Sequence, residues 1–296
     1  MTALAGAFLV AATAQASPPT FTVDVEAVYV DVFVTEANRP VAGLSESDFE
    51  LRDNGTRQHV ELVAVESLPL TTFLVLDASG SVGGVKLVQL QAAARALLAG
   101  LRPGDEASLV TFDQEISVRV PPTRDRAWLE GGVAAIRPGG ATALLDSLYA
   151  GTMLASDRGR SLLVVFTDGE DNLSWLDATQ VRRVLLESNV LVQAVGVVPA
   201  TEPGRSPGRL PAEASHVRVL RHLAETTGGR FWAAASPEKL ADAFLAILES
   251  MRTRYVLRFA PDRVGREGLH QLEVKLTRRK GKVHCRKAYF VGGRRP

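Results

Sequence analysis

The pattern of apolar and polar positions divides the chain into three regions. Residues 20–68 and 253–292 alternate apolar and polar side chains with a period of two, which predicts strands with one buried face. Residues 71–252 alternate short apolar runs with longer helix-patterned segments, which is typical of an α/β domain. We therefore expect one α/β domain between two β segments.

In the middle region, the apolar runs predict strands at 72–77, 106–113, 115–120, 161–167, 190–198 and 229–234. Helices are expected near 84–101, 125–136, 143–156, 177–188, 216–227 and 237–252. Almost nothing separates the second strand from the third, so one of these two is expected to be antiparallel at the sheet edge. The predicted fold is a doubly wound, mostly parallel six-stranded sheet of Rossmann-like type.

Each β flank is too short to bury a good core alone. The first holds the alternating run 21–36, the hairpin signal Asp53-Asn54-Gly55 and a strand near 60–65. The second holds three alternating runs, 254–261, 268–278 and 282–291. We expect the two flanks to pair into one small β domain, with the α/β domain inserted between them.

Composition excludes several classes of function. The net charge of +1 does not call for a nucleic-acid partner, and the single cysteine, Cys285, can form no internal disulfide. The five histidines are scattered without the spacing of zinc ligands, so zinc catalysis has no support.

The N-terminus has features of a signal peptide. A short apolar run ends in Ala14-Gln15-Ala16, which matches an A-x-A cleavage pattern. We expect residues 1–16 to be removed and the protein to be exported to the periplasm or the cell exterior; the alternative is a disordered Ala-rich N-terminus. The run is too short to be a stable membrane anchor.

The candidate chemistry follows the first strand of the α/β domain. The apolar run Phe73–Leu76 ends in Asp77-Ala-Ser79-Gly-Ser81, which places a carboxylate and two hydroxyls where open α/β sheets bind ligands. Such oxygen ligands suit a hard cation, with Mg²⁺ first. A phosphate loop is excluded because Val85 precedes Lys86 and Leu87 follows it, and no G-x-S-x-G nucleophile motif surrounds Ser79.

Asp77-Ala-Ser79-Gly-Ser81 resembles the Asp-x-Ser-x-Ser signature of the metal-ion-dependent adhesion site in von Willebrand factor type A (VWA) domains. The family's two other ligand motifs resemble GGATALLDSL, with Thr142, and SLLVVFTDGED, with Asp168. The first β flank also resembles the segment that precedes the VWA domain in a family of bacterial exported proteins, including several from acidobacteria.

The resemblance implies that Ser79 and Ser81 bind the metal directly and that Thr142 binds directly or through water. Asp77 and Asp168 would act mostly through waters. The ion would be Mg²⁺ or Mn²⁺, in preference to Ca²⁺, with an open position for a carboxylate of a partner protein. Each residue also has a simpler explanation when taken alone, because a strand-end Asp, a Ser or a Thr often caps the following helix.

Residues near the motifs are candidates for partner contact. Arg205 and Arg209 lie in the long Pro- and Gly-rich loop 199–213, which would emerge at the same edge of the sheet; a solvated loop is the alternative. Glu170 follows Asp168 and could tune the site or simply be solvated.

The function predicted from these features is a non-enzymatic, exported module that binds an acidic side chain of a protein partner through the metal. Two alternatives remain open. One is a structural component of an envelope or secretion complex with a stabilising metal; the other is a Mg²⁺-dependent hydrolase, for which no motif positions a general base.

Overall fold

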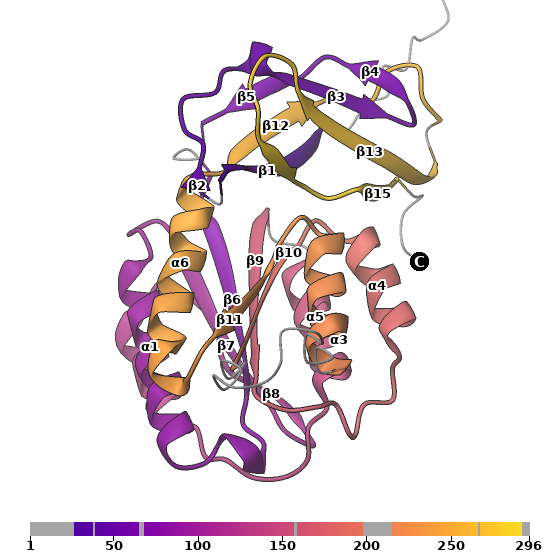
Figure 1. The fold of residues 1–296 in the computed structure, drawn as a ribbon. Helices are drawn as coiled ribbons and strands as arrows, with labels where there is room; N and C mark the ends of the chain where they lie inside the picture. The colour runs from indigo at the N-terminus through magenta and orange to yellow at the C-terminus, as the bar shows by residue number, and fades with distance from the viewer. Residues whose placement is uncertain are drawn as a thin grey trace, which may run out of the picture.

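The computed structural model describes residues 27–37, 39–64, 68–156, 159–197, 215–265 and 267–291, and these form two domains (Figure 1). The predicted signal peptide, 1–16, and the loop residues Arg205 and Arg209 lie outside the described residues.

The larger domain is built on a six-stranded sheet with the order β11-β10-β9-β6-β7-β8. Its strands are β6 (Leu70–Asp77), β7 (Glu106–Phe112), β8 (Ile116–Thr123), β9 (Arg160–Thr167), β10 (Leu191–Val197) and β11 (Phe231–Ala234). All neighbours are parallel except β8, which runs antiparallel to β7 at one edge. The predicted α/β class is confirmed.

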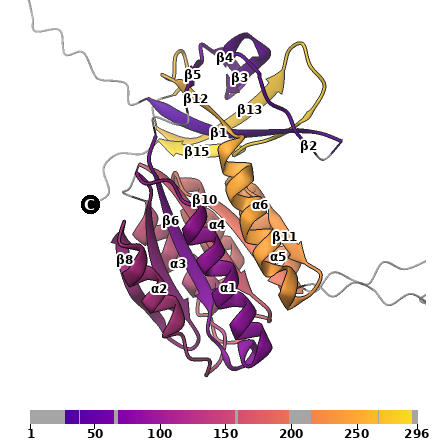
Figure 2. The same ribbon diagram turned by 90° about the vertical axis from the view of Figure 1, so that its left-hand side faces the viewer.

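Helices cover both faces of this sheet because its central strands are apolar on both sides. In β6, Leu74 and Leu76 pack against one helical layer, and Phe73 and Val75 pack against the other. The first layer holds α1 (Val85–Gly100), α2 (Arg126–Ala134) and α6 (Leu240–Arg252), and the second holds α3 (Leu144–Ala155), α4 (Ala178–Glu187) and α5 (Ser215–Thr226). Figure 2 shows α1 and α2 in front of the sheet, with α3 behind it. Short 3₁₀ turns, η3 (Gly80–Val82) and η4 (Pro237–Lys239), precede α1 and α6.

The smaller domain is a β-sandwich to which both flanks contribute. One sheet consists of β1 (Val28–Glu36), β12 (Tyr255–Phe259), β5 (Glu61–Val63), β14 (Lys282–His284) and β2 (Arg39–Pro40). The other consists of β3 (Phe49–Asp53), β4 (Thr56–Gln58), β13 (Gly268–Leu276) and β15 (Ala288–Val291). β1 pairs with β12 and β3 pairs with β13, both antiparallel. The 3₁₀ turn η1 (Glu46–Asp48) precedes β3. The chain thus enters this domain, leaves it for the α/β domain, and returns.

The last alternating run, 282–291, differs from the single strand that its pattern predicts. It forms two strands, β14 and β15, which belong to different sheets. Between them the Arg286 side chain is buried against the α/β domain, where its Nη1 donates to Asn189 Oδ1 at 3.0 Å and its Nη2 donates to the carbonyl oxygen of Ser188. This inward arginine interrupts the strand.

Arginines hold the two domains together. Arg160, the first residue of β9, pairs with Asp31 of β1, with 2.7 Å between Nη2 and Oδ1. Arg254, at the junction of α6 and β12, donates from Nη2 to the Gly228 carbonyl at 2.8 Å. Burial lowers the pKa of both Arg254 and Arg286 to about 10, so both guanidinium groups remain charged at neutral pH. The contact is therefore polar and directional, which fixes the relative position of the domains.

His284 makes this region sensitive to acid. Its pKa is lowered to about 4, first by burial and then by the positive charges of Arg230, Lys282 and Arg254. Because the unfolded chain takes up the proton near pH 6.5 and the folded chain does not, stability should fall as the pH drops from 6.5 to 4, by up to about 3 kcal/mol. Below pH 4 this contribution is lost completely.

We expect His284→Gln to flatten this dependence, as measured by urea unfolding at pH 7 and pH 4.5. His222→Gln, at an exposed position on α5, is the matched control and should keep the dependence of the wild type. The same slope in His284→Gln and in wild type would contradict the assignment.

The sandwich lies at the end of the sheet where β6 and β9 begin (Figure 1). Asp77 is the last of the eight residues of β6, seven steps from that end, or about 23 Å at 3.3 Å per residue. The carboxyl ends of the parallel strands therefore face away from the second domain. Among the described residues, no helix combines the length and apolar character needed to cross a membrane.

Candidate functional site

Asp77 ends β6 and organises the loop that follows it. Its side chain is fully buried, and its Oδ1 accepts a hydrogen bond from the Ser79 backbone N–H at 2.8 Å. Its Oδ2 accepts from Thr167 Oγ1 of β9 at 2.6 Å. Burial raises the pKa of Asp77, while the hydrogen bonds from Thr167 and Ser79 act in the opposite direction. One carboxylate oxygen thus fixes the loop that follows β6, and the other joins the ends of β6 and β9.

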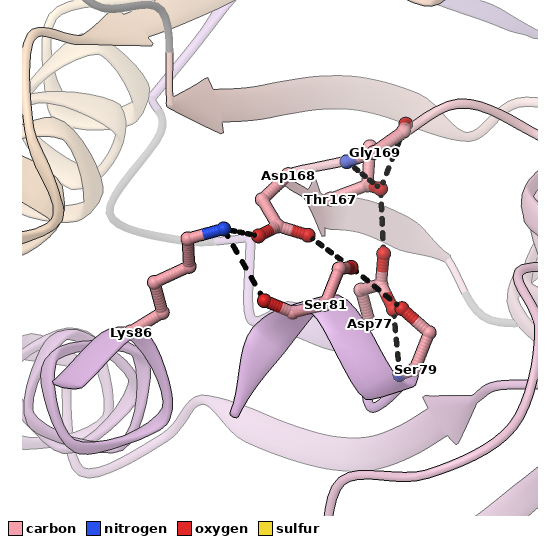
Figure 3. Close-up of polar contacts among 7 residues, drawn as sticks. All are labelled: Asp77, Ser79, Ser81, Lys86, Thr167, Asp168 and Gly169. Carbon is pink, nitrogen blue, oxygen red and sulfur yellow. Dashed lines mark hydrogen bonds and ion pairs between the residues drawn. The ribbon is translucent and has the colours of Figure 1, made fainter. Parts of the chain in front are cut away.

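A row of oxygens runs from this loop to the end of β9 (Figure 3). Ser79 Oγ lies 3.0 Å from Ser81 Oγ, and Ser81 Oγ donates to Asp168 Oδ1 at 2.7 Å. The Asp168 side chain is only 2% exposed, whereas Ser81 is at the surface. Ser81 is therefore the exposed member of this row, while Ser79, at 1% exposure, is buried like the two carboxylates.

Thr142 reaches the same place from a third loop. Gly80 N–H donates to the Gly140 carbonyl at 3.1 Å, and Gly139 N–H donates to the Ala78 carbonyl at 2.8 Å, so the two loops are joined by their backbones. An open cleft of about 320 Å³ results, and the residues that line it include Ser79, Ser81 and Thr142.

The residues after Asp168 form the other wall of the cleft, which is lined by Gly169, Glu170, Asp171 and Asn172. Asn172 Oδ1 accepts from the Thr142 backbone N–H at 2.8 Å, and Asp171 Oδ2 accepts from the Leu145 N–H in the first turn of α3 at 2.7 Å. Glu170 accepts a hydrogen bond from Ser215 Oγ of α5 at 3.0 Å. The structure thus brings together all the described candidates: Asp77, Ser79, Ser81, Thr142, Asp168 and Glu170.

Lys86 is a member of the site that the sequence did not reveal. Its Nζ forms an ion pair with Asp168 Oδ2 and donates to the Ser81 carbonyl at 3.2 Å (Figure 3). Its position five residues after Ser81 does not indicate this role, because the ion pair joins residues 82 positions apart. Asp171 and Asn172 are, like Glu170, expected beside Asp168 as residues that tune the site or are solvated, but their contacts with Leu145 and Thr142 are long-range and could not be predicted.

The donor set fits a hard divalent cation. Neighbouring oxygens around Mg²⁺, at 2.0–2.1 Å from the ion and at right angles, lie about 2.9 Å apart, and the hydrogen-bonded pair Ser79 Oγ and Ser81 Oγ has a compatible separation of 3.0 Å. Within the described ranges, no three His, Cys, Asp or Glu side chains gather into a metal site, so a cation here would be held chiefly by hydroxyls. Neutral ligands of this kind leave most of the charge on the ion.

Residues 72–170 match the family model described as von Willebrand factor type A domain. This part of the chain is a VWA domain. The matched segment runs from the start of β6 to the residues just after Asp168, so it contains every metal-ligand candidate in the three motifs.

Two solved structures have a similar fold. A von Willebrand factor type A protein from Catenulispora acidiphila superposes with a TM-score of 0.53 at 15% identity, covering 87% of this chain and 75% of that one. Proximal thread matrix protein 1 from the mussel byssus gives a TM-score of 0.50 at 15% identity, covering 62% of this chain and 48% of that one.

Among curated proteins, inter-alpha-trypsin inhibitor heavy chain H2 of Sus scrofa is 23% identical over 151 residues, or 45% of this chain. The match spans 16% of that protein's length. The similarity is therefore confined to a part of each protein, and it supports a shared domain.

Proposed function

We propose that this VWA domain is a non-enzymatic binding module, which captures a carboxylate of a protein partner at a Mg²⁺ or Mn²⁺ ion. The observation that carries the proposal is the open cleft lined by Ser79, Ser81 and Thr142 at the free end of the sheet. The bound ion would supply an electrophilic site with an open coordination position.

The roles of the protein residues follow from which of them line the cleft: Ser79, Ser81 and Thr142 do, and Asp77 and Asp168 do not. Ser79, Ser81 and Thr142 would hold the cation from the cleft, and Asp77 and Asp168 would orient the hydroxyls and balance charge from behind. Asp77 accepts two hydrogen bonds and Asp168 is engaged by Ser81 and Lys86, so neither is free to act as a general base. This favours binding over hydrolysis.

Export is part of the proposal. It rests on the predicted signal peptide of residues 1–16 and on the resemblance to bacterial exported VWA proteins. The partner would then be a periplasmic or extracellular protein that offers an acidic residue.

Calorimetric titration of the full chain with Mg²⁺ tests the proposal. We expect the wild type to bind Mg²⁺ saturably. The double variant Ser79→Ala with Ser81→Ala should bind at least tenfold more weakly, a loss of about 1.4 kcal/mol in binding free energy, because two ligands are removed. Ser45→Ala with Ser47→Ala removes two hydroxyls from the β-sandwich instead and should leave binding unchanged.

Other outcomes would replace the proposal. Absence of saturable binding in the wild type, or equal binding by both double variants, would overturn the metal site. Unfolding by a chelator would indicate a stabilising metal in a structural component. Phosphoester turnover that is lost with Ser79→Ala would indicate a hydrolase.

Lys86 should weaken metal binding. Its ammonium already neutralises Asp168, and a divalent cation a few ångströms away would be repelled by about 1–2 kcal/mol even in water-like surroundings. We expect Lys86→Gln to bind Mg²⁺ at least tenfold more tightly in the same titration. Lys275→Gln is the control, because Lys275 also pairs with a carboxylate, that of Glu273 at 2.6 Å, but in the β-sandwich. Weaker binding by Lys86→Gln would show instead that the lysine holds Asp168 in position for the metal.

A further inference from the structure

Trp175 is the most exposed large apolar side chain among the described residues, with 92% of its surface accessible. Leu173, two residues earlier in the same connection between β9 and α4, is 42% exposed. A single exposed leucine is ordinary on a protein surface, but a nearly fully exposed tryptophan beside another apolar side chain is typical of a binding surface.

The backbone that presents Trp175 is firmly held. Its own N–H and that of Leu176 donate to the two carboxylate oxygens of Asp146, each at 3.0 Å. The N–H of Ser174 donates to Asp171 Oδ1 at 3.0 Å, and Leu173 N–H donates to the Thr142 carbonyl at 3.2 Å. Three of these four consecutive amides are thus fixed to Thr142 and to α3, and that of Ser174 is fixed within the loop itself. The indole is exposed on an ordered loop, so little conformational entropy would be lost when a partner covers it.

The same contacts join this surface to the cleft. Thr142 lines the cleft and accepts from Leu173, and Asp171 lines the cleft and accepts from Ser174. Asp146, which binds the Trp175 backbone, lies in the first turn of α3, four residues after Thr142. A ligand residue seated in the cleft would therefore have its neighbours close to Leu173 and Trp175.

The charge around the cleft restricts the partner further. Glu170 lines the cleft with its side chain 66% exposed, so the rim would repel an acidic ligand unless a cation is bound behind it. A single carboxylate that must overcome this repulsion needs additional contacts, and the exposed indole offers a large apolar area for them.

We propose that the partner is a protein segment in which an acidic residue is flanked by apolar side chains, with the carboxylate in the cleft and the apolar neighbours on Leu173 and Trp175. This rests on the proposed carboxylate-binding function and specifies its ligand. Trp175 is then a specificity-determining residue that touches the partner and has no part in holding the metal.

Selection of random heptapeptides displayed on phage, against the immobilised full chain in Mg²⁺, tests this surface and the cleft separately. The wild type should enrich peptides that carry Asp or Glu next to aromatic or large aliphatic residues. The peptides that Trp175→Ala enriches should keep the acidic residue but lose the preference for apolar neighbours. This variant should also recover the peptides selected by the wild type at least tenfold less efficiently. The peptides that the double variant Ser79→Ala with Ser81→Ala enriches should lose the preference for an acidic residue.

Trp128→Ala is the matched control, since Trp128 is a half-exposed tryptophan on α2 of the same domain, and it should enrich the same peptides as the wild type. Three outcomes would contradict the role of Leu173 and Trp175 as an apolar binding surface. These are enrichment of acidic peptides without apolar neighbours, the same peptides selected by Trp175→Ala and wild type, and no enrichment at all. Apolar peptides that depend on Trp175 but not on Mg²⁺ or an acid would overturn the carboxylate function and leave Trp175 as a binding surface of another kind.

Discussion

Gly229→Ala is expected to lower the free energy of unfolding by about 4 kcal/mol or more, a loss found only where a substitution meets a specific structural obstacle. A Cβ atom at Gly229 would lie 1.7 Å from the carbonyl oxygen of Val192 in β10. Because the obstacle is backbone and not a flexible side chain, it can be relieved only by moving a central strand or the start of β11.

The reason for this close approach is the way α5 ends. Gly228, at φ +84°, and Gly229 close the helix with a Schellman motif, in which Gly229 N–H donates to the Ala224 carbonyl at 2.9 Å and Gly228 N–H donates to the Glu225 carbonyl at 3.1 Å. The chain then enters β11 directly beside β10. The same turn carries the Gly228 carbonyl that accepts from Arg254, so its distortion would also disturb the contact between the domains.

The measurement is urea unfolding followed by tryptophan fluorescence, with Gly104→Ala as the control. A Cβ at Gly104 meets nothing within 4 Å, so that variant should stay close to wild type. A Gly229→Ala protein within about 1 kcal/mol of wild type would mean that the two strands separate easily at this point.

Local patterns predicted most of the fold because each depends on neighbouring residues. The run from Phe73 to Leu76 is buried on both faces, and it has the continuous apolar character of a central parallel strand. Asn54 and Gly55 both adopt positive φ, 46° and 81°, as the hairpin signal requires.

What the sequence could not predict depends on contacts between distant segments. The alternating run 282–291 continues through Arg286, and only the tertiary contact of that arginine with Ser188 shows why the strand breaks. The ion pair of Lys86 with Asp168 joins residues 82 positions apart. Likewise, nothing in the local sequence distinguishes Asp171 or Asp146. Only the fold shows that Asp171 accepts from a backbone amide of α3 and that Asp146 accepts from the backbone amide of Trp175. The three ligand motifs could be found because the family resemblance supplies those long-range relations in advance.

Asp53→Ala is expected to lower the free energy of unfolding by about 3 kcal/mol or more, through the β-sandwich. Asp53 is fully buried at the end of β3, and its carboxylate accepts from His270 Nδ1 at 2.9 Å and from the Tyr289 hydroxyl at 2.6 Å. Removal of the carboxylate would leave two buried donors without their acceptor. The other ring nitrogen of His270, Nε2, is buried and has no hydrogen-bond partner within the described ranges, so the bond to Asp53 is important for this side chain.

The position of this cluster explains why the effect should be large. Asp53 belongs to the first flank, while His270 and Tyr289 belong to the second, 217 and 236 residues further along the chain. Their hydrogen bonds therefore join two segments that are covalently connected only through the whole VWA domain. Burial, together with the neighbouring Asp53 carboxylate, raises the pKa of Tyr289, so the phenol is protonated and can donate at neutral pH.

Two probes show whether this loss stays in the sandwich. The three tryptophans, Trp128, Trp175 and Trp232, all lie in the α/β domain, so their fluorescence follows that domain, whereas far-ultraviolet circular dichroism follows both domains. Since Arg254 and Arg286 bind the two domains together, we expect both probes to shift to lower urea in Asp53→Ala. Glu50→Ala removes a partly exposed carboxylate from the same strand and should change stability by less than about 1 kcal/mol. A shift seen by circular dichroism alone would show that the VWA domain is stable without the sandwich, and no shift by either probe would contradict the role of Asp53.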